Sequence, residues 1–262
     1  MQSETGVGVA PKRLIFIGGA EGSGTTLLLR LLAAPDACAS LGGNYIKVPK
    51  HPEARALARA FNVSNRRLWD RQLARVEHEQ ARRDVIVATD RVVRSAAFSR
   101  LTHLLFKRSS PFALPRERHT PDIWDVLDLQ GEARVVIVYR DPRAASFSAL
   151  RREFDSDIRR LAVICAEQLT LLAAQAKAMD GAVVRIVSYK RLCQDPLSTL
   201  EPLADFCGIP FDAVRAAALD ESIDGTADDR YRRELGPAEL NWLEKFFDAR
   251  RRRQWEFLES AI

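Results

Sequence analysis

The chain has 262 residues, of which 47% are hydrophobic and 29% are charged. This composition excludes a disordered or collagen-like chain and provides apolar material for the core of one domain or two. The formal net charge is +5 at pH 7, with arginine as the main cation, which suits recognition of phosphate or sulfate or, equally, a mildly basic surface. No basic stripe interleaved with aromatic residues indicates a nucleic-acid partner.

Strands and helices are expected to alternate along the chain. Branched-apolar runs at residues 14–17 and 134–139 are typical of buried parallel strands, and further strands are expected at residues 85–88, 103–107 and 183–187. Helices are expected from residue 24 to about 35, over 52–80, from 120, from 142, and over 157–179, 197–207, 211–219 and 237–259. Strands separated by helices predict one α/β domain over residues 1–262, with a central parallel sheet flanked by helices. Residues 1–11 are expected to be flexible.

The cysteines and the apolar segments indicate the compartment. Four cysteines lie far apart without a CxxC pair, so neither a disulfide framework nor a zinc cluster is expected, and a reducing compartment fits. The N-terminus lacks the apolar run of a signal peptide, and no apolar stretch reaches the roughly 18–20 residues of a membrane span. We therefore expect a cytoplasmic protein, or one that is peripheral at a membrane.

A glycine-rich segment, GAEGSGTT at residues 19–26, joins the first expected strand to the first expected helix. It matches the phosphate-binding pattern GxxxxGK[ST], except that Thr25 stands in the place of the lysine. Glycines let backbone N–H groups turn around an anion at a helix N-terminus, where the helix dipole favours negative charge. Without the lysine the loop is poorly suited to γ-phosphoryl transfer, but it can hold a 5′-phosphate or a phosphosulfate. The candidate anion-binding residues are Gly22, Ser23, Gly24, Thr25 and Thr26.

A second motif, RDPRAASFS, begins with Arg140 directly after the strand expected at residues 134–139. An arginine at the carboxyl end of a strand points into the ligand crevice of such a sheet, and Ser148 follows about two helical turns later on the same face. Together with the SGTT ending of the glycine loop, an arginine with a serine eight positions on resembles the sulfotransferases that use 3′-phosphoadenosine 5′-phosphosulfate (PAPS). The resemblance implies a P-loop-like fold in which Arg140 and Ser148 hold the 3′-phosphate by charge-assisted hydrogen bonds.

A third segment extends the resemblance to about residue 211. The stretches VSYKRL at 187–192, DP at 195–196 and FCGIP at 206–210 are similar to a tyrosine-containing region of the family. In the family this tyrosine lies close to the adenosine of the cofactor, which implies the same position for Tyr189. Residues 36–133 match the family thinly, and they cover the region in which acceptor specificity normally resides.

The resemblance also implies the reaction. The co-substrate would be PAPS, the product would be 3′,5′-ADP (PAP), and no metal would be required, because the sulfuryl group carries little charge. The acceptor would be the hydroxyl, less readily the amine, of a small molecule or saccharide. Apolar and aromatic residues within 36–133 permit a sugar, lipid-linked or aromatic acceptor. Arginines in the same region indicate an acidic saccharide or a phosphorylated acceptor, although exposed helical arginines explain them equally well. Of these acceptors we favour a carbohydrate or glycoconjugate.

The sequence departs from the family pattern at three positions. Many relatives carry Lys or Arg immediately before SGTT, where this chain has Gly22. The catalytic histidine of the family aligns with Ser109, and the glutamate that other relatives use aligns with Asn44. The usual cation and both usual bases are therefore replaced, and their roles have to fall to other residues.

Candidates for these roles lie elsewhere in the chain. Lys107, at the end of the strand expected at residues 103–107, is the candidate cation for the leaving oxygen. His119, Asp90 and His51, in that order, are the candidate bases, and the pKa of an ordinary histidine near 6.5 suits this work. Near the C-terminus Arg232 and Arg233 stand where relatives often bring a basic loop over the 3′-phosphate, although a solvated helix start explains them better.

Two other functions remain open at this point. A P-loop kinase for a nucleotide or small molecule fits the glycine loop, although Thr25 in the lysine position argues against it. A non-catalytic protein that binds a nucleotide or a sulfated ligand fits the absence of the usual bases.

Overall fold

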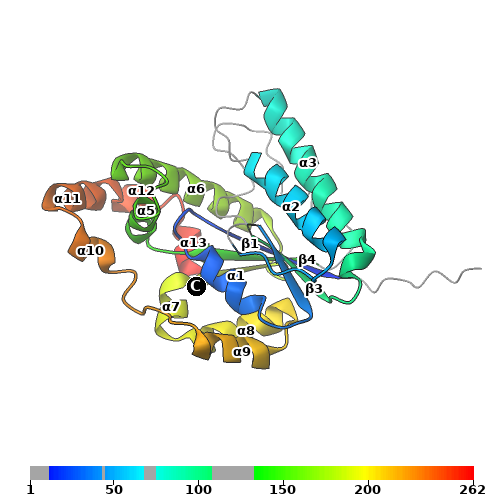
Figure 1. The fold of residues 1–262 in the computed structure, drawn as a ribbon. Coiled ribbons are helices and arrows are strands. Elements are labelled where there is room, and N and C mark those ends of the chain that lie inside the picture. Colours follow the sequence, from blue (N-terminus) through cyan, green and yellow to red (C-terminus); the bar gives the residue numbers. More distant parts are fainter. Residues whose placement is uncertain (1–11, 43–44, 68–74, 108–132) are drawn as a thin grey trace, which may run out of the picture.

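The computed structural model describes residues 12–42, 45–67, 75–107 and 133–262 (Figure 1). The expected flexible residues 1–11 and the helix expected from residue 120 lie outside these ranges. Within them, five strands form one parallel sheet in the order β2-β3-β1-β4-β5, so the expected α/β class with a central parallel sheet is confirmed. The strands are β1 (Arg13–Gly19), β2 (Cys38–Leu41), β3 (His103–Lys107), β4 (Ala133–Tyr139) and β5 (Val184–Ser188).

Among the described residues, helices connect β1 to β2, β2 to β3 and β4 to β5, and they cover both faces of the sheet (Figure 1). Those in the first half are α1 (Thr25–Leu32), α2 (Pro52–Arg67), α3 (Arg75–Arg94) and the short 3₁₀ helix η1 (Ala96–Phe98). Those between β4 and the end of α9 are α5 (Pro142–Leu150), α6 (Ile158–Ala178), α7 (Tyr189–Gln194), α8 (Pro196–Cys207) and α9 (Phe211–Asp220). The C-terminal ones are α10 (Arg230–Glu234), α11 (Pro237–Phe246), α12 (Ala249–Arg252) and α13 (Glu256–Ser260).

Alternating side chains of β1 pack against helices on opposite faces of the sheet. Leu14 and Phe16 belong to the core shared with α2, α3, α5 and α6, whereas Ile15 and Ile17 belong to the core shared with α1, α8 and α9. The chain therefore leaves β1 toward one face, through α1, and leaves β4 toward the other, through α5. Two neighbouring strands that diverge in this way open a crevice at their carboxyl ends, which is the usual ligand site of an open parallel sheet.

The register defines the two edges of the sheet. Ile17 of β1 lies opposite Lys107 of β3 and Val136 of β4, so the segments that follow these strands meet at one edge, the carboxyl edge. His103 lies opposite both Arg13 and Cys38, so the residues that precede these strands lie at the other edge, the amino edge.

One expectation about secondary structure is wrong, and one strand was not predicted. Residues 85–88 are not a strand: they lie within α3, where Val85, Ala88 and Val92 are buried at helical spacing. A short apolar run does not distinguish a strand from a buried helix segment, which explains the error. Strand β2 was not expected, because its sequence, CASL, has neither the length nor the branched residues of a typical strand.

Other expectations differ only in detail. The helix expected over 237–259 is three short helices, because the Asp248 carboxylate accepts from the Arg251 N–H and starts a new helix there. Helix α6 is long and apolar enough, by length and composition, to cross a membrane. Its apolar stripe faces the protein core, as predicted, and consists of Ile158, Leu161, Cys165, Leu169 and Leu172. All four cysteines are buried and free.

Candidate active site

The glycine loop between β1 and α1 has a backbone that only glycine accommodates at two positions. Gly22 and Gly24 have φ angles of +80° and +94°, in the left-handed region. A Cβ at Gly22 would lie 2.1 Å from the carbonyl oxygen of Ala145 in α5, and a Cβ at Gly24 would lie 2.2 Å from the ring of Tyr189. The loop is thus packed between α5 and the beginning of α7.

The loop is also tied to α6. The backbone N–H of Glu21 donates to the side-chain oxygen of Gln168 at 2.9 Å, and Gln168 is buried. Within the loop, the N–H of Ser23 donates to the carbonyl of Ala20 at 3.0 Å. These bonds fix the loop before any ligand arrives, which keeps the entropic cost of binding low.

The interior of the loop presents donors without partners. The hydroxyl of Ser23 is buried and has no hydrogen-bond partner among the described residues. The backbone N–H groups of Gly22, Gly24, Thr25 and Thr26 likewise have none in the part of the chain that the structure describes. A buried hydroxyl without a partner is costly, and an anion at this helix N-terminus would accept from it and from the loop N–H groups. The loop therefore has the donor set of a phosphate or phosphosulfate site.

Arg140 follows β4 and borders the loop from the other side of the crevice. Its side chain is only 5% exposed. Its Nη1 donates to the carbonyl of Gly22 at 2.8 Å, and its guanidinium carbon lies 4.2 Å from the centre of the Tyr189 ring. Arg140, Tyr189 and the glycine loop, all predicted as cofactor-binding residues, are thus brought into direct contact.

A turn that the sequence did not single out completes the surroundings of Arg140. Its Nε donates to the Asp228 carboxylate at 2.6 Å, and its Nη2 donates to the carbonyl of Ala227 at 2.8 Å. Burial raises the pKa of Asp228, although Arg140 acts to lower it. These contacts span 87 and 88 residues of sequence, so no local motif reveals them.

Ser148, Arg232 and Arg233 lie around this centre. Ser148 is half-buried in the last turn of α5, the helix that packs against Gly22. Arg232 and Arg233 are exposed on α10, and Arg233 donates to the Thr226 hydroxyl at 3.3 Å, in the same turn that contacts Arg140.

Lys107 ends β3 at the carboxyl edge, and it is 7% exposed. The pKa of its ammonium is lowered from the ordinary 10.5 to about 8, mainly by burial and also by the nearby Arg152, whereas Glu21 of the glycine loop acts to raise it. A Cβ at Gly42, just after β2, would lie 2.4 Å from the Lys107 carbonyl oxygen. The backbone at Gly42 therefore packs directly against the backbone of Lys107. A buried cation beside the loop is suited to stabilise negative charge on a bound group.

Two of the candidate bases lie away from the loop. Asp90 is paired with Arg94 on α3 at 2.6 Å, one turn before Val93, whose carbonyl accepts from Lys12 just ahead of β1. Asp90 is therefore at the amino edge of the sheet, not at the glycine loop. Ser109 and His119 lie outside the described residues, as does Asn44.

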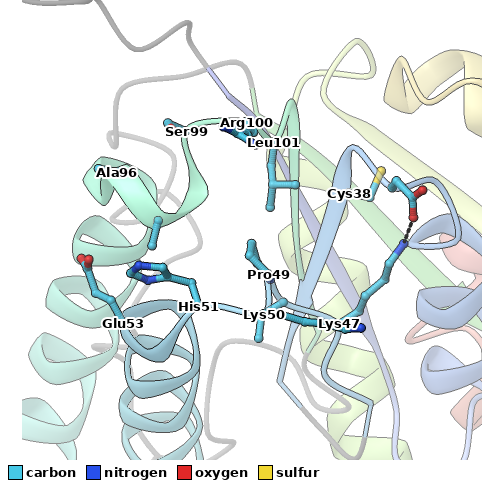
Figure 2. A pocket seen from close by; sticks show the side chains of 13 residues that line it. Cys38, Lys47, Pro49, Lys50, His51, Glu53, Ala96, Ser99, Arg100 and Leu101 are labelled. Atoms are coloured by element: carbon cyan, nitrogen blue, oxygen red, sulfur yellow. Dashed lines mark ion pairs between the residues drawn. The ribbon is translucent and has the colours of Figure 1, made fainter.

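His51 lines a cavity of about 650 Å³ at the amino edge (Figure 2). Cys38, at the start of β2, and Leu101, just before β3, border the same cavity. Figure 2 shows Lys47 on one side of it and His51 with Glu53 on the other. Lys47 forms an ion pair with Asp36. No cluster of His, Cys, Asp and Glu that would hold a metal ion is found within the described ranges.

A glycine loop after β1 and an arginine after β4, at strands that diverge to opposite faces, define an α/β protein of the P-loop type. The profile of the sulfotransferase family matches residues 14–213. The chain belongs to the sulfotransferase family.

Solved structures share the fold. The sulfotransferase domain of the olefin synthase from Synechococcus PCC 7002 is 21% identical, with a TM-score of 0.55 over 91% of this chain and 96% of that one. The sulfotransferase domain from the curacin biosynthetic pathway is 16% identical, with a TM-score of 0.57 over 95% and 98%. A sulfotransferase from Alicyclobacillus acidocaldarius is 17% identical, with a TM-score of 0.53 over 93% and 94%. No curated protein matches the sequence.

Proposed function

We propose that this sulfotransferase takes the sulfuryl group from PAPS, transfers it to an acceptor hydroxyl and releases PAP. The observation that carries the proposal is the buried Ser23 hydroxyl, which has no hydrogen-bond partner among the described residues. It lies in a loop that has no P-loop lysine and touches Arg140. That loop offers neutral N–H and O–H donors, which suit the weakly charged sulfuryl end of a phosphosulfate better than a triphosphate.

The remaining groups of PAPS find matching residues nearby. Arg140 and Ser148 would hold the 3′-phosphate, since a guanidinium offers forked, charge-assisted hydrogen bonds. The Tyr189 ring, which lies close to Gly24 and Arg140 and is half-buried, would lie beside the adenosine. Arg232 and Arg233 would add positive charge beside the 3′-phosphate from α10.

The transfer itself forms one S–O bond and breaks another. The acceptor oxygen bonds to sulfur, the bond from sulfur to the bridging oxygen of the 5′-phosphate breaks, and that oxygen keeps the electron pair and leaves with PAP. Lys107 would stabilise the negative charge that builds on the leaving oxygen, and no metal is needed for that task. The acceptor proton goes to a general base. Because Asp90 and His51 lie at the amino edge, we keep His119 as the base; it stays a prediction from the sequence.

The acceptor is proposed to be a saccharide or glycoconjugate hydroxyl, as the arginine and aromatic content of residues 36–133 favours. Two neighbours in fold are domains of an olefin synthase and of the curacin biosynthetic pathway, so hydroxyls of biosynthetic intermediates belong in the same acceptor screen. Four free, buried cysteines support the proposal that the enzyme works in the reducing cytoplasm.

Thermal unfolding with PAP, and separately with ATP and Mg²⁺, tests the proposal against its alternatives. A ligand at a hundredfold excess over its dissociation constant stabilises by about 2.7 kcal/mol, so PAP should raise the melting temperature clearly and ATP with Mg²⁺ should not. Stabilisation by ATP with Mg²⁺ alone would overturn the proposal in favour of a kinase. Stabilisation by PAP, combined with no sulfuryl transfer from PAPS to any acceptor of the screen, would favour a binding protein.

A further inference from the structure

The turn between α9 and α10, residues 221–229, covers the side chain that is proposed to hold the 3′-phosphate. Figure 1 shows this connection running past α7, the helix that begins with Tyr189. Arg140 has two forks with which it can hold an oxyanion, and the side-on fork consists of Nε and Nη2. Both donors of that fork are taken by the turn, Nε by the Asp228 carboxylate and Nη2 by the Ala227 carbonyl.

The second fork is partly occupied as well, because Nη1 donates to the carbonyl of Gly22. With the Arg140 side chain only 5% exposed, a phosphate has no open approach to the side-on fork. The Asp228 side chain is 12% exposed, so its charge is shielded little by water. A phosphate and a carboxylate on one buried guanidinium repel each other strongly.

The second half of the turn, residues 224–229, has the features of a segment that can move. It lies between two helices, and Gly225 and Thr226 are exposed. Its internal bonds are local: the Asp224 carboxylate accepts from the N–H and the hydroxyl of Thr226 and from Arg230. At its start the turn is held by the ion pair of Glu221 with Arg30 of α1 and by Ile223, which packs against the core shared with α1, α8 and α9. The contacts of Asp228 and Ala227 with Arg140 fasten its second half over the crevice.

We propose that Asp228 is a resident competitor of the 3′-phosphate, so that a nucleotide binds by exchanging its phosphate for this carboxylate on Arg140. The inference rests on the proposed use of a 3′-phosphorylated nucleotide. The exchange sets the affinity of the site, and the return of Asp228 to Arg140 helps to expel PAP after the transfer. Asp228 is a positioning residue in this scheme, since it acts on the nucleotide through Arg140.

The test compares Asp228→Asn with wild type in calorimetric titrations of PAP and of 5′-AMP. Asparagine keeps the shape of the side chain and removes its charge. Loss of a charge-assisted hydrogen bond to Arg140 should tighten PAP binding by about tenfold or more, with a much smaller change for 5′-AMP. The matched control is Asp220→Asn, which removes an exposed carboxylate at the end of α9, just before the turn, and should leave both affinities unchanged.

Turnover gives a second readout that a purely structural role does not produce. In Asp228→Asn the KM for PAPS should fall and kcat should fall with it, because PAP leaves more slowly. Wild-type binding of PAP with unchanged or weaker binding by Asp228→Asn would overturn the exchange and leave the proposed function standing. Absence of PAP binding in both proteins would overturn the proposed function and the exchange together.

A variant that unfolds is also informative. If Asp228→Asn does not fold, Asp228→Ser, which is smaller and also uncharged, is measured in the same way. Failure of both variants to fold, judged by circular dichroism, would assign Asp228 to folding and overturn the exchange.

Discussion

Replacing Lys107 by methionine should make the protein more stable and far less active. The pKa of Lys107 falls from the ordinary 10.5 to about 8 because the side chain is buried. Each pKa unit corresponds to 1.36 kcal/mol, so keeping this ammonium charged inside the fold costs about 3 kcal/mol at neutral pH. Lys107→Met keeps the unbranched apolar stem and removes the charge. The free energy of unfolding at pH 7 should therefore rise, by up to that amount.

The sign of the pH dependence follows from proton counting. Between about pH 8 and 10.5 the unfolded lysine keeps its proton while the folded one has lost it, so wild-type stability rises with pH across this window. Below pH 8 both states are protonated and the full cost is present. Lys107→Met lacks this rise, so its advantage over wild type should shrink from pH 7 to pH 10. Urea unfolding at both pH values measures the difference.

Loss of the Lys107 proton, which stabilises the fold, should lower the activity. The protonated lysine is the one that stabilises the leaving oxygen, so kcat/KM should fall as pH rises through about 8. Lys107→Met should lower kcat by about 10²-fold or more, as expected for a lost electrostatic contact to the transition state. Lys107→Arg keeps its charge at every accessible pH, so its kcat/KM should no longer fall above about pH 8.

The matched control is Lys245→Met, on the exposed side of α11, which should change stability by no more than about 0.5 kcal/mol and leave turnover intact. Two results would refute the reasoning about Lys107. If the free energies of unfolding of wild type and Lys107→Met change with pH in parallel, burial of the ammonium does not destabilise the fold. Full turnover by Lys107→Met would mean that it does not act on the leaving oxygen.

Three further predictions concern the loop and Arg140. Ser23→Ala removes a buried hydroxyl without a described partner, so the melting temperature should stay or rise while PAP affinity falls about tenfold by calorimetry; the reverse pattern contradicts the anion site. Gly24→Ala forces a Cβ to 2.2 Å from the Tyr189 ring at a φ of +94° and should cost about 1–3 kcal/mol in urea unfolding; an equally stable variant refutes this close approach. Arg140→Ala leaves the Asp228 charge buried and unpaired and should lower the free energy of unfolding in urea by about 3–5 kcal/mol. Adding Asp228→Asn to this variant should restore part of the loss, and no recovery in the double variant means that the two residues are not coupled.

The parts of the site that the sequence predicts are those with a local signal. A branched-apolar run followed by closely spaced glycines predicts a strand, a turn and a helix whatever the rest of the chain does, and β1, the loop and α1 follow that pattern. Arg140 is predicted for the same reason, since it directly follows the apolar strand β4. Strand order and register then bring these local elements together.

The residues that sequence reasoning missed act through distant contacts. Gln168 lies in the middle of a helix, and its role depends on the Glu21 N–H, 147 residues earlier in the chain. Asp228 lies in a polar turn that reads as an ordinary loop, and only the packing of the turn onto Arg140 gives it significance. The error at residues 85–88 has a related cause, because the partner that buries a short apolar run is not visible in the run itself.

The departure from the family pattern at Gly22 and the burial of Lys107 have one physical explanation. At Gly22 a positive φ and a Cβ position 2.1 Å from the Ala145 carbonyl exclude any side chain, so the Lys or Arg of many relatives does not fit. Strand β3 pairs directly with β1 and ends in Lys107 opposite Ile17, so it can present a cation at the same edge. Glu21 of the loop raises the pKa of Lys107 and so offsets part of the cost of burial. Because methionine would fill the same space without that cost, a lysine here is better explained by what its charge does for a bound anion than by the stability of the fold.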